Sequence, residues 1–159
     1  MGLDATVYCN CYEKGDLKTL PHPEWRLKRD TDGSLICIND NIDIDLEVDQ
    51  WILNNMCKHE NGEALSHYIG NISMVGHIRS ILEPHQNNIP IIFQQIIYSG
   101  SHCGDFIPYS EIPSLVSEIN FISKLSYSDK DDNQIHKQFV EQLQNLVDAC
   151  NEFDNPIAF

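Results

Sequence analysis

The chain has 159 residues, of which 42% are hydrophobic and 21% are charged. This length and balance are typical of one globular domain, and they exclude a disordered tail, a coiled coil and a collagen-like repeat. No apolar run approaches the roughly 20 residues that span a membrane, and the start Met-Gly-Leu-Asp-Ala lacks the features of a secretory signal. We therefore expect a soluble, cytoplasmic protein with a single domain over residues 1–159.

Acidic residues outnumber basic residues by 24 to 10, which gives a formal net charge of −14 at pH 7. A surface this negative repels the phosphates of nucleic acids and of anionic lipids, and it attracts positively charged partners. The charge therefore argues against nucleic acid or a membrane as partner, and it favours a protein with a basic surface.

Alternating apolar residues near the N-terminus predict an opening strand over residues 4–11. Residues 12–33 contain several glycines and prolines, which predict a long connection that Trp25 fastens to the body of the protein. A short second strand is expected over residues 34–38, after an Asp-Gly turn.

Residues 42–56 fit both an alternating and a helical pattern. We favour a helix that begins near Asp45, because this aspartate can cap the first turn. Glu47 and Asp49 then lie at the positive end of the helix dipole. Residues 58–62 end this helix.

The second half of the chain predicts three more helices and a buried strand. Asn71 can cap a helix that ends at Pro84, and residues 112–122 and 135–150 have apolar residues at helical spacing. Residues 89–98 are apolar enough for a buried strand, with a helical turn at the start of the segment as an alternative. Residues 155–159 are expected to add an edge strand or to plug the core. The class is α+β, with a small mixed or antiparallel sheet packed against about four helices.

Half of the net charge lies in residues 30–57, which contain seven acidic residues and no Lys or Arg. Such a face accelerates docking on a basic partner more than it raises affinity. The expected partner contacts are Asp40, Asp43, Asp45, Glu47 and Asp49. The alternative is a solvated helix start, because acidic first turns are common. The spacing of Asp40, Asp43 and Asp45, with no central glycine, excludes an EF-hand calcium loop.

Six cysteines in a chain without a signal sequence favour thiols over disulfides. Cys9 and Cys11 share a face of the predicted strand, and Cys57 and His59 form a second close pair. Together they make a candidate zinc site with three thiolates and one imidazole. Their C-x-C and C-x-H spacings differ from the usual C-x₂-C knuckle, and thiols buried in the core are the alternative reading.

Residues 99–105 place a histidine, a thiol and a carboxylate around two glycines, directly after the predicted buried strand. Polar groups in such loops often meet a ligand, so His102 is a candidate acid–base in a pocket, with Asp105 to orient it. The alternative is that both residues fasten a tight glycine turn. Cys103 is poorly placed to act with His102, because neighbouring side chains of extended backbone point apart. The chain also lacks a G-x-S-x-G nucleophile elbow.

Several motifs resemble those of a family of short bacterial proteins, and the resemblance covers nearly the whole chain. These motifs are the opening Met-Gly-Leu-Asp-Ala-x-Val-x-Cys-x-Cys, Cys-x-His-Glu at 57–60, Ile-Gly-Asn at 69–71, Ser-Gly-x-His-x-Gly-Asp at 99–105 and Asn-Pro-Ile-x-Phe at 155–159. The resemblance implies no particular chemistry. In that family the residue after the loop histidine need not be cysteine.

In size, acidity and α+β character the chain is also similar to immunity proteins of bacterial polymorphic-toxin and contact-dependent inhibition systems. This similarity implies an acidic surface that covers the basic active site of a cognate toxin. We therefore predict a non-enzymatic immunity protein that neutralises its toxin by charge-complementary binding, with no cofactor. The alternative is a small enzyme or zinc-binding protein that uses residues 99–105 or the set of Cys9, Cys11, Cys57 and His59.

Overall fold

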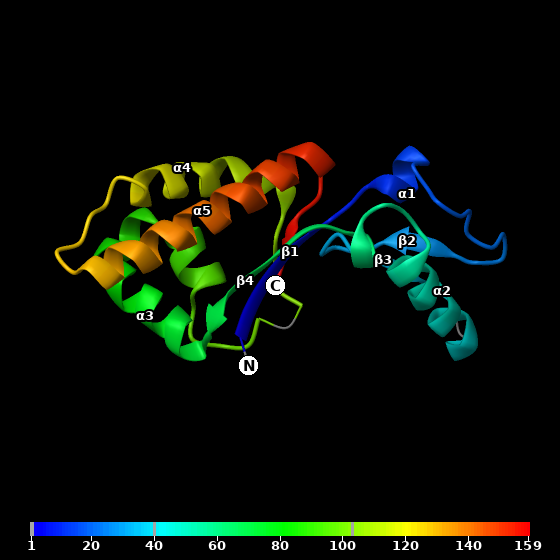
Figure 1. Cartoon of the computed structure of the whole chain (residues 1–159), viewed down its shortest axis with the longest axis horizontal. Coiled ribbons are helices and arrows are strands. Elements are labelled where there is room, and N and C mark those ends of the chain that lie inside the picture. The colour runs from blue at the N-terminus through cyan, green and yellow to red at the C-terminus, as the bar shows by residue number, and fades with distance from the viewer. Residues whose placement is uncertain (1, 40, 103) are drawn as a thin grey trace.

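A computed structural model describes residues 2–39, 41–102 and 104–159, and it confirms the α+β class (Figure 1). The strands are β1 (Gly2–Tyr8), β2 (Leu27–Arg29), β3 (Leu35–Cys37), β4 (Glu63–Asn71), β5 (Phe106–Ile107) and β6 (Ile157–Ala158). The helices are α1 (Cys11–Lys14), α2 (Ile42–Asn54), α3 (Ile72–Leu82), α4 (Ile112–Ile122) and α5 (Lys130–Phe153). Short helical turns are η1 (Glu60–Gly62), η2 (Glu83–Asn88), the π-helix η3 (Ile92–Ile96) and η4 (Tyr109–Glu111).

The molecule has two parts, and the long β1–β4 strand pair runs from one of them toward the other (Figure 1). We call β1, β4, β5, β6 and helices α3, α4 and α5 the large lobe. We call α1, β2, β3 and α2 the small lobe. None of the helices in the described residues is long and apolar enough to cross a membrane.

The large lobe contains a four-stranded antiparallel sheet in the order β4-β1-β6-β5. Every second residue of β1 is buried, as the alternation predicted, and these residues are Leu3, Ala5 and Val7. β6 pairs with β1 on one side and with β5 on the other, through Ala158 opposite Thr6 and Phe106. The C-terminal tail is therefore an inner strand, which corrects the expected edge position.

Helices α3, α4 and α5 pack together with the sheet around one apolar core. The predicted faces of α4 and α5 are confirmed, because Leu115, Ile119, Phe139 and Leu143 are almost completely buried. Burying one side chain of this size contributes about 1.5–3 kcal/mol. The sequence predicted one apolar face of α3 made of Ile72, Val75, Ile78 and Leu82. This is right except at Ile72, which is 69% exposed.

The buried strand predicted over residues 89–98 is wrong, because this segment forms a helical turn that continues into the π-helix η3. A short apolar run does not distinguish a buried strand from a buried helix. The helical form is stabilised from outside the segment. The buried carboxylate of Glu118 in α4 accepts hydrogen bonds from the backbone N–H groups of Ile91 at 3.0 Å and Ile92 at 2.8 Å.

The small lobe has its own apolar cluster, in which the indole rings of Trp25 and Trp51 meet edge to face with centroids 5.6 Å apart. β3 confirms the predicted second strand, and β2 adds a hairpin partner within the predicted connection. Helix α2 begins at Ile42, where the side chain of Asn41 accepts a hydrogen bond from the N–H of Asp43. Asp45 lies inside the helix, so its predicted capping role is wrong.

Candidate metal centre

Four side chains that can bind a metal converge where β1 ends and β4 begins. β1 is antiparallel to β4 and ends with Tyr8 opposite Glu63, so the residues after β1 lie beside those before β4. The N–H of Cys9 extends this pairing by donating to the carbonyl of Gly62 at 2.8 Å. Strand pairing thus brings the 9–11 segment to the 57–59 segment, although they are distant in the sequence.

Three of the six distances between the ligand atoms match the edges of a tetrahedral site. The Sγ atoms of Cys9 and Cys57 are 3.6 Å apart, and Nδ1 of His59 lies 3.3 Å from Sγ of Cys11 and 3.7 Å from Sγ of Cys57. All four ligand atoms lie within 4.8 Å of one another. A tetrahedral ion with bonds of about 2.3 Å to sulfur and 2.0–2.1 Å to nitrogen would separate its ligands by about 3.8 Å (S to S) and 3.6 Å (S to N). These three separations agree with the tetrahedral edges to within about 0.3 Å, and the other pairs of ligand atoms lie within 4.8 Å of one another.

Cys11 reaches the set from a different element than expected. The opening strand ends at Tyr8, and Cys11 is the first residue of α1, so the two cysteines do not share a strand face. The carbonyl of Cys11 accepts from the N–H of Asp16 at 2.9 Å, and the side-chain amide of Asn10 donates to the carbonyl of Phe153 at 2.7 Å. These bonds hold the turn that directs both thiols to one point.

A sharp turn returns the chain from His59 to β4. Asn61 and Gly62 both have positive φ values, 55° and 71°. A Cβ atom at residue 62 would lie 3.0 Å from Cε of Met56, so glycine satisfies both the backbone conformation and the close packing.

Burial determines the protonation of these groups when no metal is bound. The three cysteines are buried, and His59 is partly buried. Burial raises the pKa of Cys9, and burial together with the neighbouring thiols raises the pKa of Cys11 to about 12. The pKa of His59 is lowered, first by burial and then by the charge of Lys58. The imidazole is therefore neutral and ready to bind, whereas the thiols of Cys9 and Cys11 must lose protons.

The predicted set of Cys9, Cys11, Cys57 and His59 is thus brought together, and it can hold a metal ion. Four protein ligands fill a tetrahedral shell, which is typical of structural metal sites and leaves no position open for a substrate. No disulfide forms among the described cysteines.

Four of the five acidic residues expected to contact a partner lie on α2. Asp43, Glu47 and Asp49 are exposed, and Asp45 is partly buried. Asp40 lies outside the described residues. Among the described residues, the ion pairs join Arg29 to Glu13 and His77 to Asp132, so the carboxylates of α2 are not neutralised by salt bridges.

His102 and Asp105 are not brought together as an acid–base pair. The carboxylate of Asp105 lies 2.5 Å from the hydroxyl of Tyr98, while the N–H of Asp105 donates to the carbonyl of His102 at 2.9 Å. The two side chains line different cavities, with Tyr98 and Phe159 bordering both. The backbone contact agrees with the turn alternative for this loop. Cys103 lies outside the described residues.

Arg79 is a site residue that the sequence analysis missed. It lines the same cavity as His102, and its Nη1 donates to the carbonyls of Phe93 and Ile97. Its place beside the apolar face of α3 was visible in the sequence, but the segment that it contacts was expected to be a strand.

Comparison with known proteins adds no relative: no protein-family model, no curated protein and no solved structure matches this chain.

Proposed function

We propose that this chain is a zinc-binding protein in which one zinc ion, held by Cys9, Cys11, Cys57 and His59, fastens the small lobe to the end of the sheet. The observation that carries the proposal is the convergence of four ligand atoms within 4.8 Å of one another, with three of their separations close to the edges of a tetrahedral site. Thiolate and imidazole ligands suit zinc, whereas magnesium and calcium prefer oxygen ligands.

The ion would add to links that already join these segments, among them the apolar cluster of the small lobe and the hydrogen bond from the N–H of Lys18 to the carbonyl of Met56 at 2.8 Å. Cys9 directly follows β1, and Cys11 is the first residue of α1. Cys57 follows the end of α2, and His59 precedes β4. One ion bound to all four side chains would therefore fix α1 and the C-terminal end of α2 against the strand pair. Its role is structural, because the shell contains no open position.

Titration of metal-free, reduced protein with Co²⁺ and then Zn²⁺ tests this proposal. Tetrahedral cobalt bound to thiolates absorbs visible light, so the absorbance should saturate at one Co²⁺ per chain and vanish when zinc displaces cobalt. Cys11→Ser should lower the zinc affinity by at least about 100-fold, since even changes next to metal ligands cost 10–100-fold. Cys37→Ser is the matched control, because Cys37 is a partly buried thiol outside the set. Equal cobalt absorbance in the two variants would refute the assignment.

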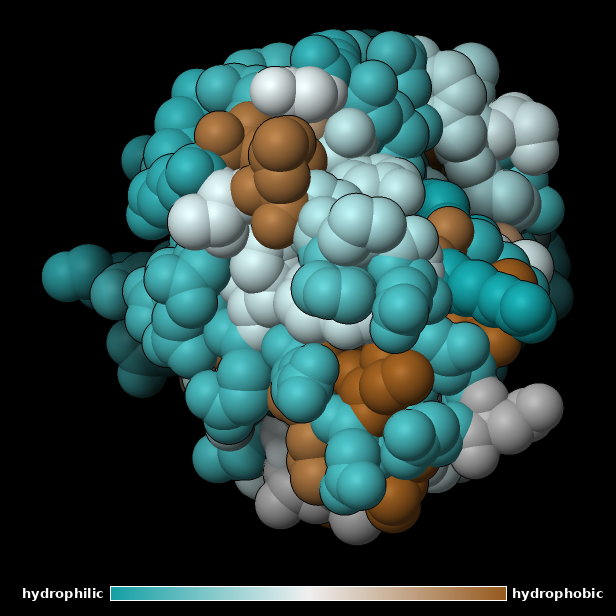
Figure 2. Space-filling view, turned by 90° about the vertical axis from the view of Figure 1, so that its right-hand side faces the viewer, coloured by the Kyte–Doolittle hydropathy of each residue, from teal (hydrophilic) through white to brown (hydrophobic). Residues whose placement is uncertain are grey.

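A second function, binding of a positively charged partner, is favoured by a different observation. Helix α2 exposes apolar side chains among its acids: Ile42 is 73% exposed and Leu46 is 58% exposed. Figure 2 shows this side of the molecule, where hydrophobic groups lie among hydrophilic ones. Apolar contacts supply affinity and acidic groups supply attraction, which is the combination expected of an immunity protein that covers a basic toxin.

Co-purification with the product of a neighbouring gene, at low and at high salt, tests this second function. The double variant Asp43→Asn/Glu47→Gln should slow association several-fold at low salt. Glu141→Gln/Asp148→Asn removes the same charge from exposed positions of α5 and should leave association nearly unchanged. A neighbouring product that forms no complex at either salt concentration would end this reading.

A further inference from the structure

We propose that a cavity in the large lobe, remote from the metal centre, binds a small organic monocarboxylate with an apolar body. The cavity has a volume of about 520 Å³. Cavities of roughly 300–1,000 Å³ are the usual size for small-molecule sites. Its walls come from the start of β1, from α3, from residues 97–102 and from the C-terminal Phe159.

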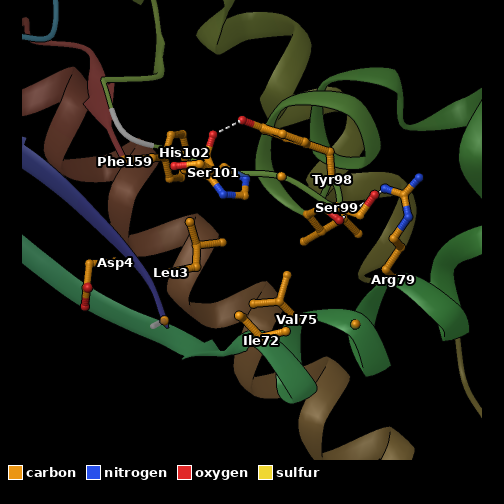
Figure 3. A pocket seen from close by; sticks show the side chains of 14 residues that line it. Leu3, Asp4, Ile72, Val75, Arg79, Tyr98, Ser99, Ser101, His102 and Phe159 are labelled. Atoms are coloured by element: carbon orange, nitrogen blue, oxygen red, sulfur yellow. Dashed lines mark hydrogen bonds between the residues drawn. The ribbon is translucent and has the colours of Figure 1, made fainter.

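Most of the wall is apolar. Leu3 and Val75 are buried residues that extend into the space from β1 and α3, and Ile72 lies beside Val75 (Figure 3). Ile97 lies in the same wall, after η3. Such a surface gives up its water readily to an alkyl or aryl group, so the cavity selects an apolar body.

His102 supplies a polar atom without a partner. Its imidazole extends into the cavity on the side opposite Ile72 and Val75 (Figure 3). The ring is held between Tyr98, with centroids 4.2 Å apart, and Phe159, with centroids 6.1 Å apart. Its Nε2 atom is buried and has no hydrogen-bond partner among the described residues. A buried polar atom left in this state is costly, so a ligand that hydrogen-bonds to it gains affinity.

Arg79 supplies positive charge at the same cavity. Its Nη1 donates to the carbonyls of Phe93 at 2.9 Å and Ile97 at 3.1 Å, and its guanidinium carbon lies 3.9 Å from the centre of the Phe93 ring. These contacts orient the guanidinium, but none of the groups that it contacts carries a full negative charge. Within the described part of the chain Arg79 forms no ion pair. Asp4, the acid that lines the cavity, points away from its centre (Figure 3).

These features together specify the ligand class. An apolar wall favours an alkyl or aryl body, and the imidazole nitrogen without a partner favours a hydrogen-bonding head group. The guanidinium of Arg79, which has no acidic partner among the described residues, favours a ligand with negative charge over one with positive charge. A monocarboxylate combines all three properties.

Gly76 makes the site testable without damaging the fold. It lies in α3, lines the cavity and is exposed, and a Cβ atom built there would meet nothing within 4 Å. A large side chain at this position can therefore occupy cavity space. The substitution also replaces a glycine inside a helix, which itself favours folding.

The experiment is a titration of the purified protein with octanoate, followed by ¹H–¹⁵N NMR, with 1-octanol as the uncharged control of equal chain length. Octanoate should shift the amide signals of Leu3, Gly76 and Ile97, and 1-octanol should bind at least about tenfold more weakly, as expected for loss of a charge-assisted contact. Gly76→Phe should weaken octanoate binding, while Gly76→Ala should retain it.

Four results would overturn the proposal. Octanol that binds as tightly as octanoate would contradict the assignment of an anion. Octanoate shifts confined to other surfaces, or equal binding by Gly76→Phe and Gly76→Ala, would contradict the assignment of this cavity. An absence of any octanoate shift in the folded protein would contradict both.

Discussion

The two lobes differ in how many buried apolar residues they contain. Among the described residues, 25 buried residues make up the core of the large lobe, whereas the small-lobe cluster contains six. Three of those six are the thiols of Cys9, Cys11 and Cys57. A core of this size rarely stabilises a fold unless a metal or a disulfide reinforces it. In the proposed site the same thiols serve both as packing and as metal ligands, in the lobe where buried apolar residues are fewer.

Removal of zinc should have the most unequal effect on the two lobes. Structural zinc contributes about 10–16 kcal/mol in small zinc-binding peptides, so its loss should open the small lobe and leave the large core folded. Hydrogen exchange measured with and without a chelator should show faster exchange in α2 and in the β2–β3 hairpin, with α5 unchanged. Exchange that accelerates equally in both lobes, or in neither, would contradict this division.

Acidification should weaken zinc binding steeply. Because the pKa values of Cys9 and Cys11 are raised in the metal-free protein, both thiols are protonated near neutral pH and must release protons on binding. The zinc affinity should therefore fall by at least about two orders of magnitude for each pH unit below 8. Competition titrations at several pH values measure this slope, and a flat profile would remove the thiols from the site.

In the metal-free protein the same raised pKa values make alkali, rather than acid, the condition that lowers the stability of the folded state. A thiol whose pKa is raised on folding favours the folded state below its ordinary pKa of about 9, and this contribution is lost as the pH rises through about 12. The metal-free small lobe should therefore lose stability in alkali.

A cavity in the large core should destabilise the protein without affecting the metal. Phe139→Ala removes an almost fully buried ring from α5 and should cost about 3–5 kcal/mol in the free energy of unfolding. Denaturant unfolding measures this loss, and zinc titration is the control. A large drop in zinc affinity would show that the lobes are more strongly coupled than we infer.

The smallest expected effect comes from removing the side chain that caps one helix in each lobe. The side chain of Asn41 caps α2 in the small lobe, and that of Asn71 caps α3 in the large lobe. Replacing either residue by alanine should cost about 1 kcal/mol. With zinc bound, Asn41→Ala should accelerate hydrogen exchange only in the small lobe, while Asn71→Ala should lower global stability. Identical exchange patterns would argue for a single cooperative unit.

Local patterns predicted much of the fold. The alternation of β1, the Asn71 cap of α3 and the apolar faces of α4 and α5 were all readable, because each depends on residues close together in sequence. The run at 89–98 was misread because its helical form depends on the carboxylate of Glu118, which is remote in the sequence. The start of α2 was misread because Asp45 and Asn41 are both suitable caps.

The candidate metal site was predictable as a set of residues but not as a geometry. Cys9, Cys11, Cys57 and His59 have suitable chemistry, yet their proximity depends on the antiparallel pairing of β1 with β4. That partner strand was not identified in the sequence. The cavity beside His102 was even harder to predict from the sequence, because Arg79, Phe159 and the start of β1 meet there only through tertiary packing.

Elemental analysis of freshly purified protein tests the central claim most directly. If a single zinc ion completes the small lobe, the wild-type chain should contain close to one zinc per molecule, and Cys11→Ser should contain almost none under the same purification. Equal zinc content in the two proteins, whether near one or near zero, would contradict the account.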